Sequence, residues 1–348
     1  FWVDDNEDEI ALLEREINHN IQKRQKELEL TIALTNYCNF SCVYCYQNKN
    51  EKLMTTEVAN MIIEKIDRIL NDNIFEGINI HYFGGEPLLN IPVLVYLDEN
   101  IKKITDKIGI VYKAFLTTNG SMLSKELLQK VKFSSIQLTF DGLEKTHDRL
   151  RVSDHFHFKE EIELIENIMN FSQAKVLLRT NICKENKDEI IALHKYIFEK
   201  FGNERIEINP NRTIKYHQDD SFEMLSVQEY AEVAYQIKLL WSEQKGKFEL
   251  PVPRSTPCKF PYGNAYAISP EGYCTFCSGS MDQEKKYFFD VDIENKKMFS
   301  VRKECKKCNI LPLCLGGCII QYNLRAGACT YEKYELKNIL ISYIKHIS

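Results

Sequence analysis

The sequence has no apolar run of about 18 residues and no excess of basic residues, and each absence excludes a class of protein. Without such a run, no segment is long and apolar enough to cross a bilayer as a helix. Lys plus Arg number 45 against 50 Asp plus Glu, so the net charge of −5 does not attract a polyanion. We therefore expect no nucleic-acid partner and no membrane partner.

The N-terminus also lacks the basic and then apolar pattern of a signal peptide, because the chain begins Phe1-Trp2-Val3-Asp4-Asp5. We therefore expect a cytoplasmic protein in a reducing compartment. The first residue is not Met, so we also expect a processed or truncated form from which an N-terminal piece is missing.

Cysteine is the outlying residue type, with 12 in 348 residues. Small secreted domains use this density for disulfides, but a chain of this length with 44% hydrophobic residues can bury a core without them. Metal or cluster ligation is therefore the leading interpretation. Cys183 matches no ligand spacing, and we expect it to be a buried structural thiol.

From about residue 30, short apolar runs alternate with longer helical patterns, which predicts an α/β fold with a parallel sheet covered by helices. The pattern allows a doubly wound sheet or a partial barrel, and in both the functional groups lie at the carboxyl ends of the strands. The predicted strands are 30–34, 78–83, 111–116, 136–140, 176–182 and 206–209, and the predicted helices are 55–71, 88–105, 123–132, 158–172, 186–200 and 227–244.

Changes in pattern divide the chain into four predicted segments. Residues 1–29 hold an amphipathic helix, expected to pack outside the main body, and residues 30–250 form the α/β domain. Residues 251–330 hold 8 of the 12 cysteines among Pro and Gly turns, with little periodic core, so a bound metal or cluster must organise them. Residues 331–348 are predicted to be a closing helix.

The first predicted strand is followed directly by Cys38, Cys42 and Cys45, a C-x3-C-x2-C loop. Three thiolates on one short loop suit a cubane iron–sulfur cluster that keeps one iron open. A zinc knuckle with a distant fourth ligand is the alternative, although zinc sites more often use paired C-x2-C units.

This loop resembles the signature of the radical S-adenosylmethionine (SAM) enzymes, with Tyr44 as the aromatic residue before the last cysteine. The resemblance implies a partial (β/α)6 barrel of the TIM type, in which the open iron chelates the amino and carboxylate groups of SAM. Reductive cleavage of SAM in that family gives methionine and a 5'-deoxyadenosyl radical, so the cofactor carries the radical chemistry.

Motifs at the later strand ends extend the resemblance over most of residues 30–210. Gly84-Gly85-Glu86-Pro87 matches the family's GGEP motif, whose backbone and carboxylate receive the SAM ammonium. Thr139 stands where relatives usually have Ser, and keeps the hydroxyl. The residues that the resemblance assigns to SAM binding are Tyr44, Gly84, Gly85, Glu86, Thr118, Asn119, Thr139, Asp141, Arg151, Arg179 and Asn181, of which Arg151 ends the family's HD-x2-R stretch that begins at His147.

The C-terminal cysteines resemble the seven-cysteine SPASM extension of radical SAM peptide maturases. The resemblance implies two auxiliary clusters, hence three [4Fe-4S] clusters in all. Cys274 is either the fourth ligand of the inner auxiliary cluster or a bystander beside an open iron of that cluster. A pair of zinc ribbons is the alternative for all the C-terminal cysteines. The implied outer ligands are Cys305, Cys308, Cys314 and Cys329, and the implied inner ligands are Cys258, Cys277 and Cys318.

We expect an enzyme, a radical SAM oxidoreductase that abstracts hydrogen from a ribosomally made precursor peptide and closes a thioether or carbon–carbon crosslink. The implied partners are that peptide and a one-electron reductant of the flavodoxin or ferredoxin type. A leader-binding domain, as in some peptide maturases, would be missing from this chain or supplied separately.

Two other functions remain as alternatives. An anaerobic sulfatase maturase, which makes formylglycine, uses the same architecture, but such relatives carry Asp directly after the inner-cluster cysteine, where this chain has Ser278 after Cys277. A zinc-ribbon interaction protein is the alternative that is not an enzyme.

Overall fold

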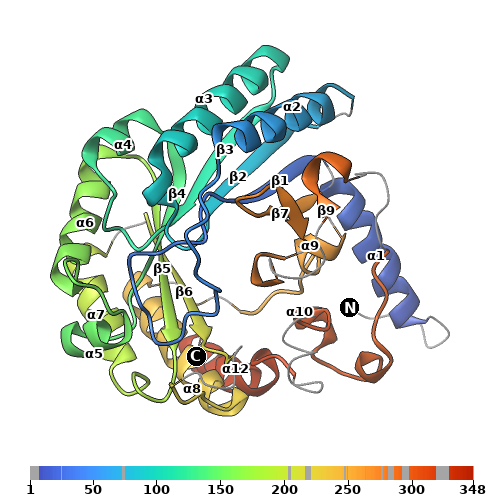
Figure 1. The fold of residues 1–348 in the computed structure, drawn as a ribbon. Coiled ribbons are helices and arrows are strands. Elements are labelled where there is room, and N and C mark those ends of the chain that lie inside the picture. The colour runs from blue at the N-terminus through green and yellow to red at the C-terminus, as the bar shows by residue number, and fades with distance from the viewer. Residues whose placement is uncertain are drawn as a thin grey trace. The chain divides into compact units, whose positions relative to one another are not determined.

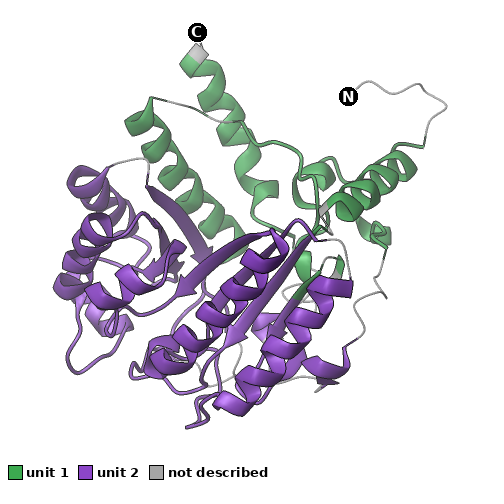
Figure 2. Cartoon of the chain, turned by 90° about the horizontal axis from the view of Figure 1, so that it is seen from above, with its two compact units in different colours: residues 1–26, 226–265, 292–348 green, residues 27–225, 266–291 purple. Residues whose placement is uncertain are grey.

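Two compact units make up the chain in a computed structural model (Figure 2). The barrel unit comprises residues 27–225 and 266–291, and the helical unit comprises residues 1–26, 226–265 and 292–348. The predicted domain boundaries follow sequence pattern rather than packing and stay a prediction. The structure describes residues 8–24, 26–72, 75–202, 205–215, 221–246, 248, 250–262, 264–275, 277–280, 286–291, 298–318 and 329–347.

Six parallel strands in the order β6-β5-β4-β3-β2-β1 form the main part of the sheet (Figure 1). This is a parallel sheet of six strands with helices between them, as a partial (β/α)6 barrel requires, so the predicted fold class is confirmed. The strands are β1 (Glu27–Ala33), β2 (Gly77–Phe83), β3 (Val111–Thr117), β4 (Phe133–Thr139), β5 (Lys175–Ile182) and β6 (Ile206–Arg212).

Helices cover the outer face of these strands (Figure 1). In β2, Ile78, Ile80 and Tyr82 are fully buried, whereas Asn79 and His81 lie on the opposite face and are partly exposed. The period of two gives each strand an apolar outer face and a more polar inner face. The helices are α2 (Thr56–Asp72), α3 (Ile91–Ile108), α4 (Lys125–Lys130), α5 (Glu144–Leu150), α6 (Phe158–Phe171) and α7 (Ile190–Phe201).

Two predicted helices begin later than expected, and α5 was not predicted. The segment 88–105 divides into a 3-10 turn η1 (Pro87–Asn90) and α3, because Pro92 is tolerated only in the first helical turn. Helix α7 begins at Ile190 because the Asn186 side chain donates to the carbonyls of Asp141 and Asn181, both at 2.8 Å, and holds a turn there.

Three short strands that the sequence analysis did not predict extend the sheet beyond β1. They are β7 (Ala265–Ile268), β8 (Tyr273–Thr275) and β9 (Lys286–Tyr287), and they pair antiparallel with one another. The turn between β7 and β8 places Gly272 at φ +83°, a conformation that favours glycine. Short 3-10 turns η2 (Ser278–Ser280) and η3 (Phe288–Asp290) follow in this part of the chain.

The helical unit contains α1 (Glu9–Arg24), α8 (Val227–Lys245), α9 (Lys259–Tyr262), η4 (Lys303–Cys305), α10 (Leu311–Cys314) and α12 (Glu332–Ile347). Helices α8 and α12 pack together, with the rings of Tyr230 and Tyr331 edge to face at 5.2 Å. None of the helices in the described ranges is long and apolar enough to cross a membrane.

Helix α1 is the amphipathic helix that the sequence predicts, and it is a core element of the helical unit. Ile17 and Ile21 are buried against Phe299, Val301, Leu311 and Leu315, and Cys305 and Cys308 pack against this cluster. The Asn18 amide donates to the Phe299 carbonyl at 2.9 Å and accepts from the Phe299 amide at 2.8 Å. The helix therefore supports the segment that carries the C-terminal cysteines.

Replacing Ile17 by Ala should lower the unfolding free energy of the helical unit by about 2–5 kcal/mol, because it leaves a cavity in this small apolar cluster. The neighbouring Glu16 is exposed, so Glu16→Ala is the matched control. Urea unfolding of both variants measures the difference, and equal stabilities would show that α1 is not part of this core.

Candidate functional site

The loop that carries the first three cysteines, residues 35–52, is fixed at its base by two glycines. A Cβ on Gly84 would lie 2.3 Å from the Thr35 carbonyl oxygen, and one on Gly85 would lie 2.2 Å from the Tyr37 carbonyl oxygen. The Gly85 amide donates to Thr35 at 2.8 Å, and the Glu86 amide donates to Tyr37 at 2.9 Å. Only glycine permits this approach, and the backbone that comes close is that of the cysteine loop.

The Glu86 carboxylate joins the carboxyl ends of β2 and β3. It is fully buried and accepts from the Thr118 hydroxyl at 2.7 Å, the Asn119 amide at 2.6 Å and the Leu88 amide at 3.0 Å. Burial raises the pKa of Glu86, and these donors oppose that shift. Both oxygens are thus engaged within the protein, and the predicted contact of this carboxylate with the SAM ammonium stays a prediction.

Asn119 extends from the end of β3 to the cysteine loop. Its side-chain amide donates to the Asn39 side-chain carbonyl at 2.8 Å and lies 3.9 Å from the Cys38 sulfur. Its own side-chain carbonyl accepts from the Ser121 amide at 2.9 Å. The predicted residue Asn119 therefore orients the first cysteine of the loop.

Tyr44, between the second and third cysteines, is held by the end of β4. Its hydroxyl donates to the carboxylate of Asp141, which is fully buried and also accepts from the Asn181 amide at 2.6 Å. Arg179 donates to the Asn181 side chain at 2.9 Å. Burial raises the pKa of Asp141, and the nearby Arg151 cation opposes the shift. Three predicted strand-end residues thus form one network under the loop.

A buried histidine–glutamate pair continues this network into α6. His147 Nδ1 accepts from the Asp141 amide at 3.5 Å, which leaves Nε2 to face the Glu161 carboxylate at 3.2 Å. Sequence reasoning missed Glu161, which is fully buried. The signal was present, because Glu161 shares the spacing of Phe158 and Ile165 on the apolar face of the helix.

Arg151 is the buried cation of the site. Its side chain is 6% exposed, and the guanidinium lies 5.3 Å from the centre of the Phe40 ring. Desolvation disfavours the protonated form of Arg151, but nearby acidic groups, with Glu161 the strongest, outweigh it and raise the pKa of Arg151. Its Nε atom has no hydrogen-bond partner among the described residues, so it is a buried donor available to a ligand.

The three cysteines of the loop form no disulfide, and neither do the other nine. The Cys38 sulfur accepts from the Phe40 amide at 3.4 Å, and the Cys45 amide donates to the Cys42 carbonyl at 3.1 Å. Burial raises the pKa of Cys42 to about 11, with Arg151 opposing the shift. A bound metal would replace the proton on such a thiol.

Among the described residues, no group of three or more His, Cys, Asp or Glu is arranged to hold a single metal ion. A cubane differs from a single ion because each of its thiolates binds a different iron, which spaces the ligands more widely. The donor set of the loop, three thiols and no imidazole or carboxylate ligand, therefore fits a cluster better than one ion.

The four cysteines predicted as outer ligands line a single pocket in the helical unit. This pocket has a volume of about 430 Å³ and is lined by Cys305, Cys308, Cys314 and Cys329 together with polar residues. Left-handed residues after α10, Leu315 at φ 46° and Gly316 at φ 85°, turn the chain so that the Gly316 amide donates to the Cys314 sulfur at 3.4 Å. The donor set fits a four-iron cluster, and its ligation stays a prediction.

The cysteines predicted as inner ligands are divided between the two units. Cys274 and Cys277 belong to the barrel unit, and Cys258 and Cys318 belong to the helical unit. Cys274 lies in β8 and is 7% exposed, and burial raises its pKa to about 12. The Cys277 sulfur accepts from the Gly279 amide at 3.3 Å. The inner ligand set stays a prediction.

The prediction that Cys183 is buried is confirmed, since it is 0% exposed. It packs with Leu150 and Phe222, against which Val43 and Tyr44 also lie. Its sulfur donates to the Asn186 side chain at 3.6 Å. This thiol therefore supports the cysteine loop from beneath.

Of the remaining predicted residues, Thr139 is 8% exposed at the end of β4.

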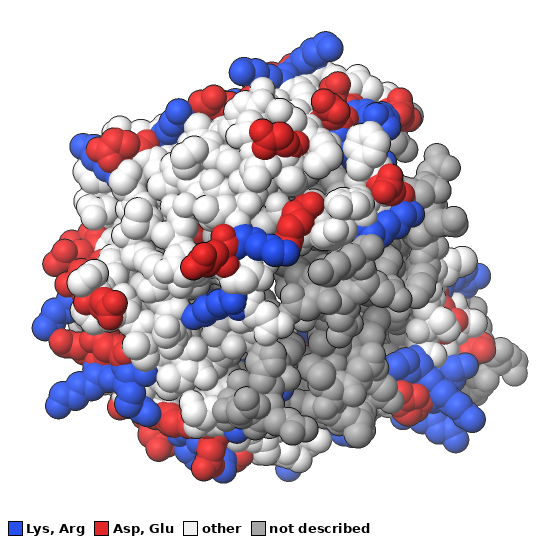
Figure 3. Space-filling model, viewed as in Figure 1, with Lys and Arg blue, Asp and Glu red and all other residues white. Residues whose placement is uncertain are grey.

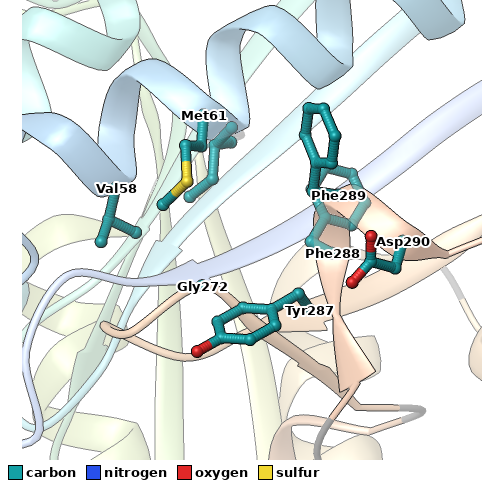
Figure 4. A pocket seen from close by; sticks show the side chains of 8 residues that line it. Val58, Met61, Gly272, Tyr287, Phe288, Phe289 and Asp290 are labelled. Atoms are coloured by element: carbon teal, nitrogen blue, oxygen red, sulfur yellow. The ribbon is translucent and has the colours of Figure 1, made fainter.

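The barrel unit has a pocket of its own, which lies apart from the predicted site residues. It has a volume of about 320 Å³, and Figure 4 shows Val58 and Met61 projecting into it from α2, opposite Tyr287 and Phe289. Asp290 supplies the carboxylate of its lining. None of the predicted site residues lines this apolar pocket, so we do not count it in the candidate site.

Comparison with known proteins relates the part of the chain that carries these residues to a known family. Residues 32–197, which hold the cysteine loop and the strand-end network, match the Radical SAM superfamily. The chain contains a radical SAM domain. Domains of this family bind SAM and one [4Fe-4S] cluster, and the three thiols and the unpartnered Arg151 donor fit those two groups.

Two curated relatives show how far the likeness extends. The chain is 34% identical over 119 residues to an uncharacterized protein of Methanocaldococcus jannaschii, covering 33% of this chain and 39% of that protein. It is 24% identical over 372 residues to the radical SAM cyclopropyl synthase TigE of Paramaledivibacter caminithermalis, covering 94% of this chain and 76% of that protein. The chain thus spans less than half the length of the first relative.

Solved structures share the fold over more than nine-tenths of the chain. The structure of anSMEcpe with bound AdoMet and Cp18Cys peptide has a TM-score of 0.71 at 18% identity, covering 92% of this chain and 98% of that one. Streptococcus suis SuiB bound to precursor peptide SuiA has a TM-score of 0.62 at 17% identity, covering 91% of this chain and 77% of that one.

Replacing Glu161 by Gln should lower the unfolding free energy by about 3–5 kcal/mol, because it removes a buried countercharge of Arg151 and the partner of His147. The matched control is Glu163→Gln, since Glu163 lies exposed on the same helix. Denaturant unfolding of the two variants measures the difference. Equal stability of the two variants would show that the Glu161 carboxylate does not stabilise Arg151 and His147.

Proposed function

We propose that this chain is a radical SAM peptide maturase, which abstracts hydrogen from a precursor peptide and closes a thioether or carbon–carbon crosslink. The observation that carries this proposal is the second set of thiols, because a radical SAM domain by itself needs only the three cysteines of its loop. Four further free cysteines line one pocket of the helical unit, and such a set suits an auxiliary cluster.

The residues of the barrel unit have distinct roles in this proposal. Cys38, Cys42 and Cys45 hold the cluster, which when bound supplies the electron that cleaves SAM to methionine and a 5'-deoxyadenosyl radical. The buried guanidinium of Arg151 offers its free Nε donor to the SAM carboxylate. Asp141 and Asn119 orient the loop through Tyr44 and Asn39, so that the thiols keep their positions.

The inner face of the sheet is the proposed place for the peptide. His81 Nε2 lies 2.7 Å from the Thr117 hydroxyl, and the Asn209 amide donates to the Gln137 side chain at 3.2 Å. These side chains come from β2, β3, β4 and β6 and can donate and accept hydrogen bonds. Such polar groups suit the main chain of a peptide, which also donates and accepts.

Relatives with long alignments support the peptide substrate and the type of bond. SuiB and anSMEcpe have structures with bound peptides and share this fold. TigE, which aligns over 94% of this chain, is named a cyclopropyl synthase, so its product contains new carbon–carbon bonds. These likenesses favour peptide maturation, with a flavodoxin or ferredoxin as the proposed reductant.

Ser278 weighs against the sulfatase maturase alternative. It follows Cys277 where that type carries Asp, and a serine hydroxyl is a much weaker base than a carboxylate. The formylglycine reaction would therefore need another base in this chain. Mass spectrometry of the peptide encoded beside this gene, before and after reaction, separates a crosslink from formylglycine, because the mass changes and the fragment patterns differ.

Replacing Cys38, Cys42 and Cys45 together by Ala should abolish SAM cleavage, and iron should fall from about 12 to about 8 atoms per chain. The other ligands lie on separate segments and should keep their iron. Measurement of 5'-deoxyadenosine after dithionite reduction, with iron analysis, tests this. Cys183→Ala is the control that should keep all the iron. Zinc in place of iron in the parent protein would favour the zinc-ribbon alternative.

The role of Cys274 is tested by Cys274→Ala. If Cys274 is a ligand of the inner cluster, as we propose, that cluster should be lost or weakened, and iron should fall toward about 8 atoms per chain. A fully ligated cluster can only pass electrons, whereas an open iron could also bind a substrate thiolate. Full iron content together with normal product would show that Cys274 is a bystander and would support the open-iron mechanism.

A further inference from the structure

Lysines surround the four-cysteine pocket of the helical unit. Lys307 and Lys333 line the pocket itself, and Lys303 and Lys306 flank Cys305 in the sequence. All four lysines are exposed, and we call them the basic rim. On the face drawn in Figure 3, Lys and Arg side chains gather at the lower right, where Figure 1 draws the loop that precedes α10.

The positive charge of the basic rim is largely uncompensated. Lys303, Lys306 and Lys307 form no ion pair with any residue in the ranges that the structure describes. The nearby carboxylates are engaged with arginines instead, since Glu332 accepts from Arg254 at 2.7 Å and Glu304 lies 3.8 Å from Arg302. The fourth lysine, Lys333, lies 3.8 Å from the Cys329 sulfur.

This local charge is opposite to that of the whole chain, whose net charge is −5. Exposed lysines without ion pairs attract an acidic surface over a distance of about 10 Å at an ionic strength of about 0.1 M. Such a patch sets partner choice and association rate more than it sets affinity. The site therefore fits a partner with an acidic face that meets the protein beside the four thiols.

We propose that the basic rim is the docking surface for an acidic one-electron carrier protein. The inference rests on the proposed function, because the four thiols give the carrier a reason to bind there. In the exchange the carrier is oxidised by one electron and the cluster held by those thiols is reduced by one, and no bond forms or breaks.

The test uses cluster-loaded protein and an oxidised flavodoxin with an acidic surface as the probe. The double variant Lys303→Glu/Lys306→Glu should weaken flavodoxin binding by about tenfold to a hundredfold, and the loss should shrink as salt is raised. Lys102→Glu/Lys103→Glu is the matched control, because it makes the same charge change on exposed residues of α3. It should bind flavodoxin within about twofold of the parent.

A second measurement distinguishes a loss of docking from a loss of folding in the rim variant. SAM cleavage with dithionite, a small reductant that needs no docking surface, should be the same in the rim variant and the parent, while cleavage driven by reduced flavodoxin falls. Equal flavodoxin affinity in the rim and control variants would overturn the proposal. So would tighter binding of a poly-glutamate peptide than of flavodoxin, because the rim would then be a site for acidic peptides.

The iron content distinguishes the two possible failures. If the parent protein holds about 12 iron atoms and the rim substitutions do not change flavodoxin binding, only the proposed docking surface is overturned. A parent with about 8 iron atoms, and none bound by Cys305 and Cys308, overturns the outer cluster, and with it the reason for a carrier to bind here.

Discussion

The site depends on one constraint, which is that the loop bearing the first three cysteines has little regular structure and must be held by buried polar groups. Its backbone lies against Gly84 and Gly85 so closely that a Cβ on either residue would clash. Its side chains reach the ends of β3 and β4 through Asn39 and Tyr44. A buried polar group lowers stability unless it has a hydrogen-bond partner, so few other arrangements of these side chains are possible. The network therefore holds the three thiols in one arrangement.

The same network gathers three buried carboxyl groups around one cation. Glu86, Asp141 and Glu161 are fully buried carboxylates, and Arg151 is the buried cation beside them. Burial raises the pKa of Glu86 and of Asp141, which means that each carboxylate would be stabilised by further positive charge nearby. SAM carries a sulfonium cation. Binding a cationic ligand therefore offsets part of the desolvation of these carboxylates, and the free Arg151 donor can still pair with the ligand's own carboxylate.

The parts predicted from the sequence are those whose signal is local. The six parallel strands could be predicted because short apolar runs alternate with longer helical patterns, and the cysteine spacings stand in the sequence itself. Helix α5 was missed because its seven residues show no apolar period, and its fold depends on the contact of His147 with Glu161. Glu161 was missed because a carboxylate in a helical pattern usually faces water. The packing partner of α1 could not be predicted. Amphipathicity shows that one face of a helix is buried, but it does not show which segment covers that face.

If the helical unit binds the proposed auxiliary cluster, that binding is linked to the packing of a distant segment. Its six-residue apolar cluster joins α1 to residues 299–315, and Cys305 and Cys308 pack against that cluster. The two parts of this cluster lie about 280 residues apart in the sequence, so its packing must offset the entropy cost of closing that loop, a cost that grows only slowly with length. A cluster bound by cysteines on this segment would order the surface on which Ile17 and Ile21 pack. By the same linkage, the packing of α1 must favour cluster binding by an equal free energy, since each order of assembly reaches the same folded state.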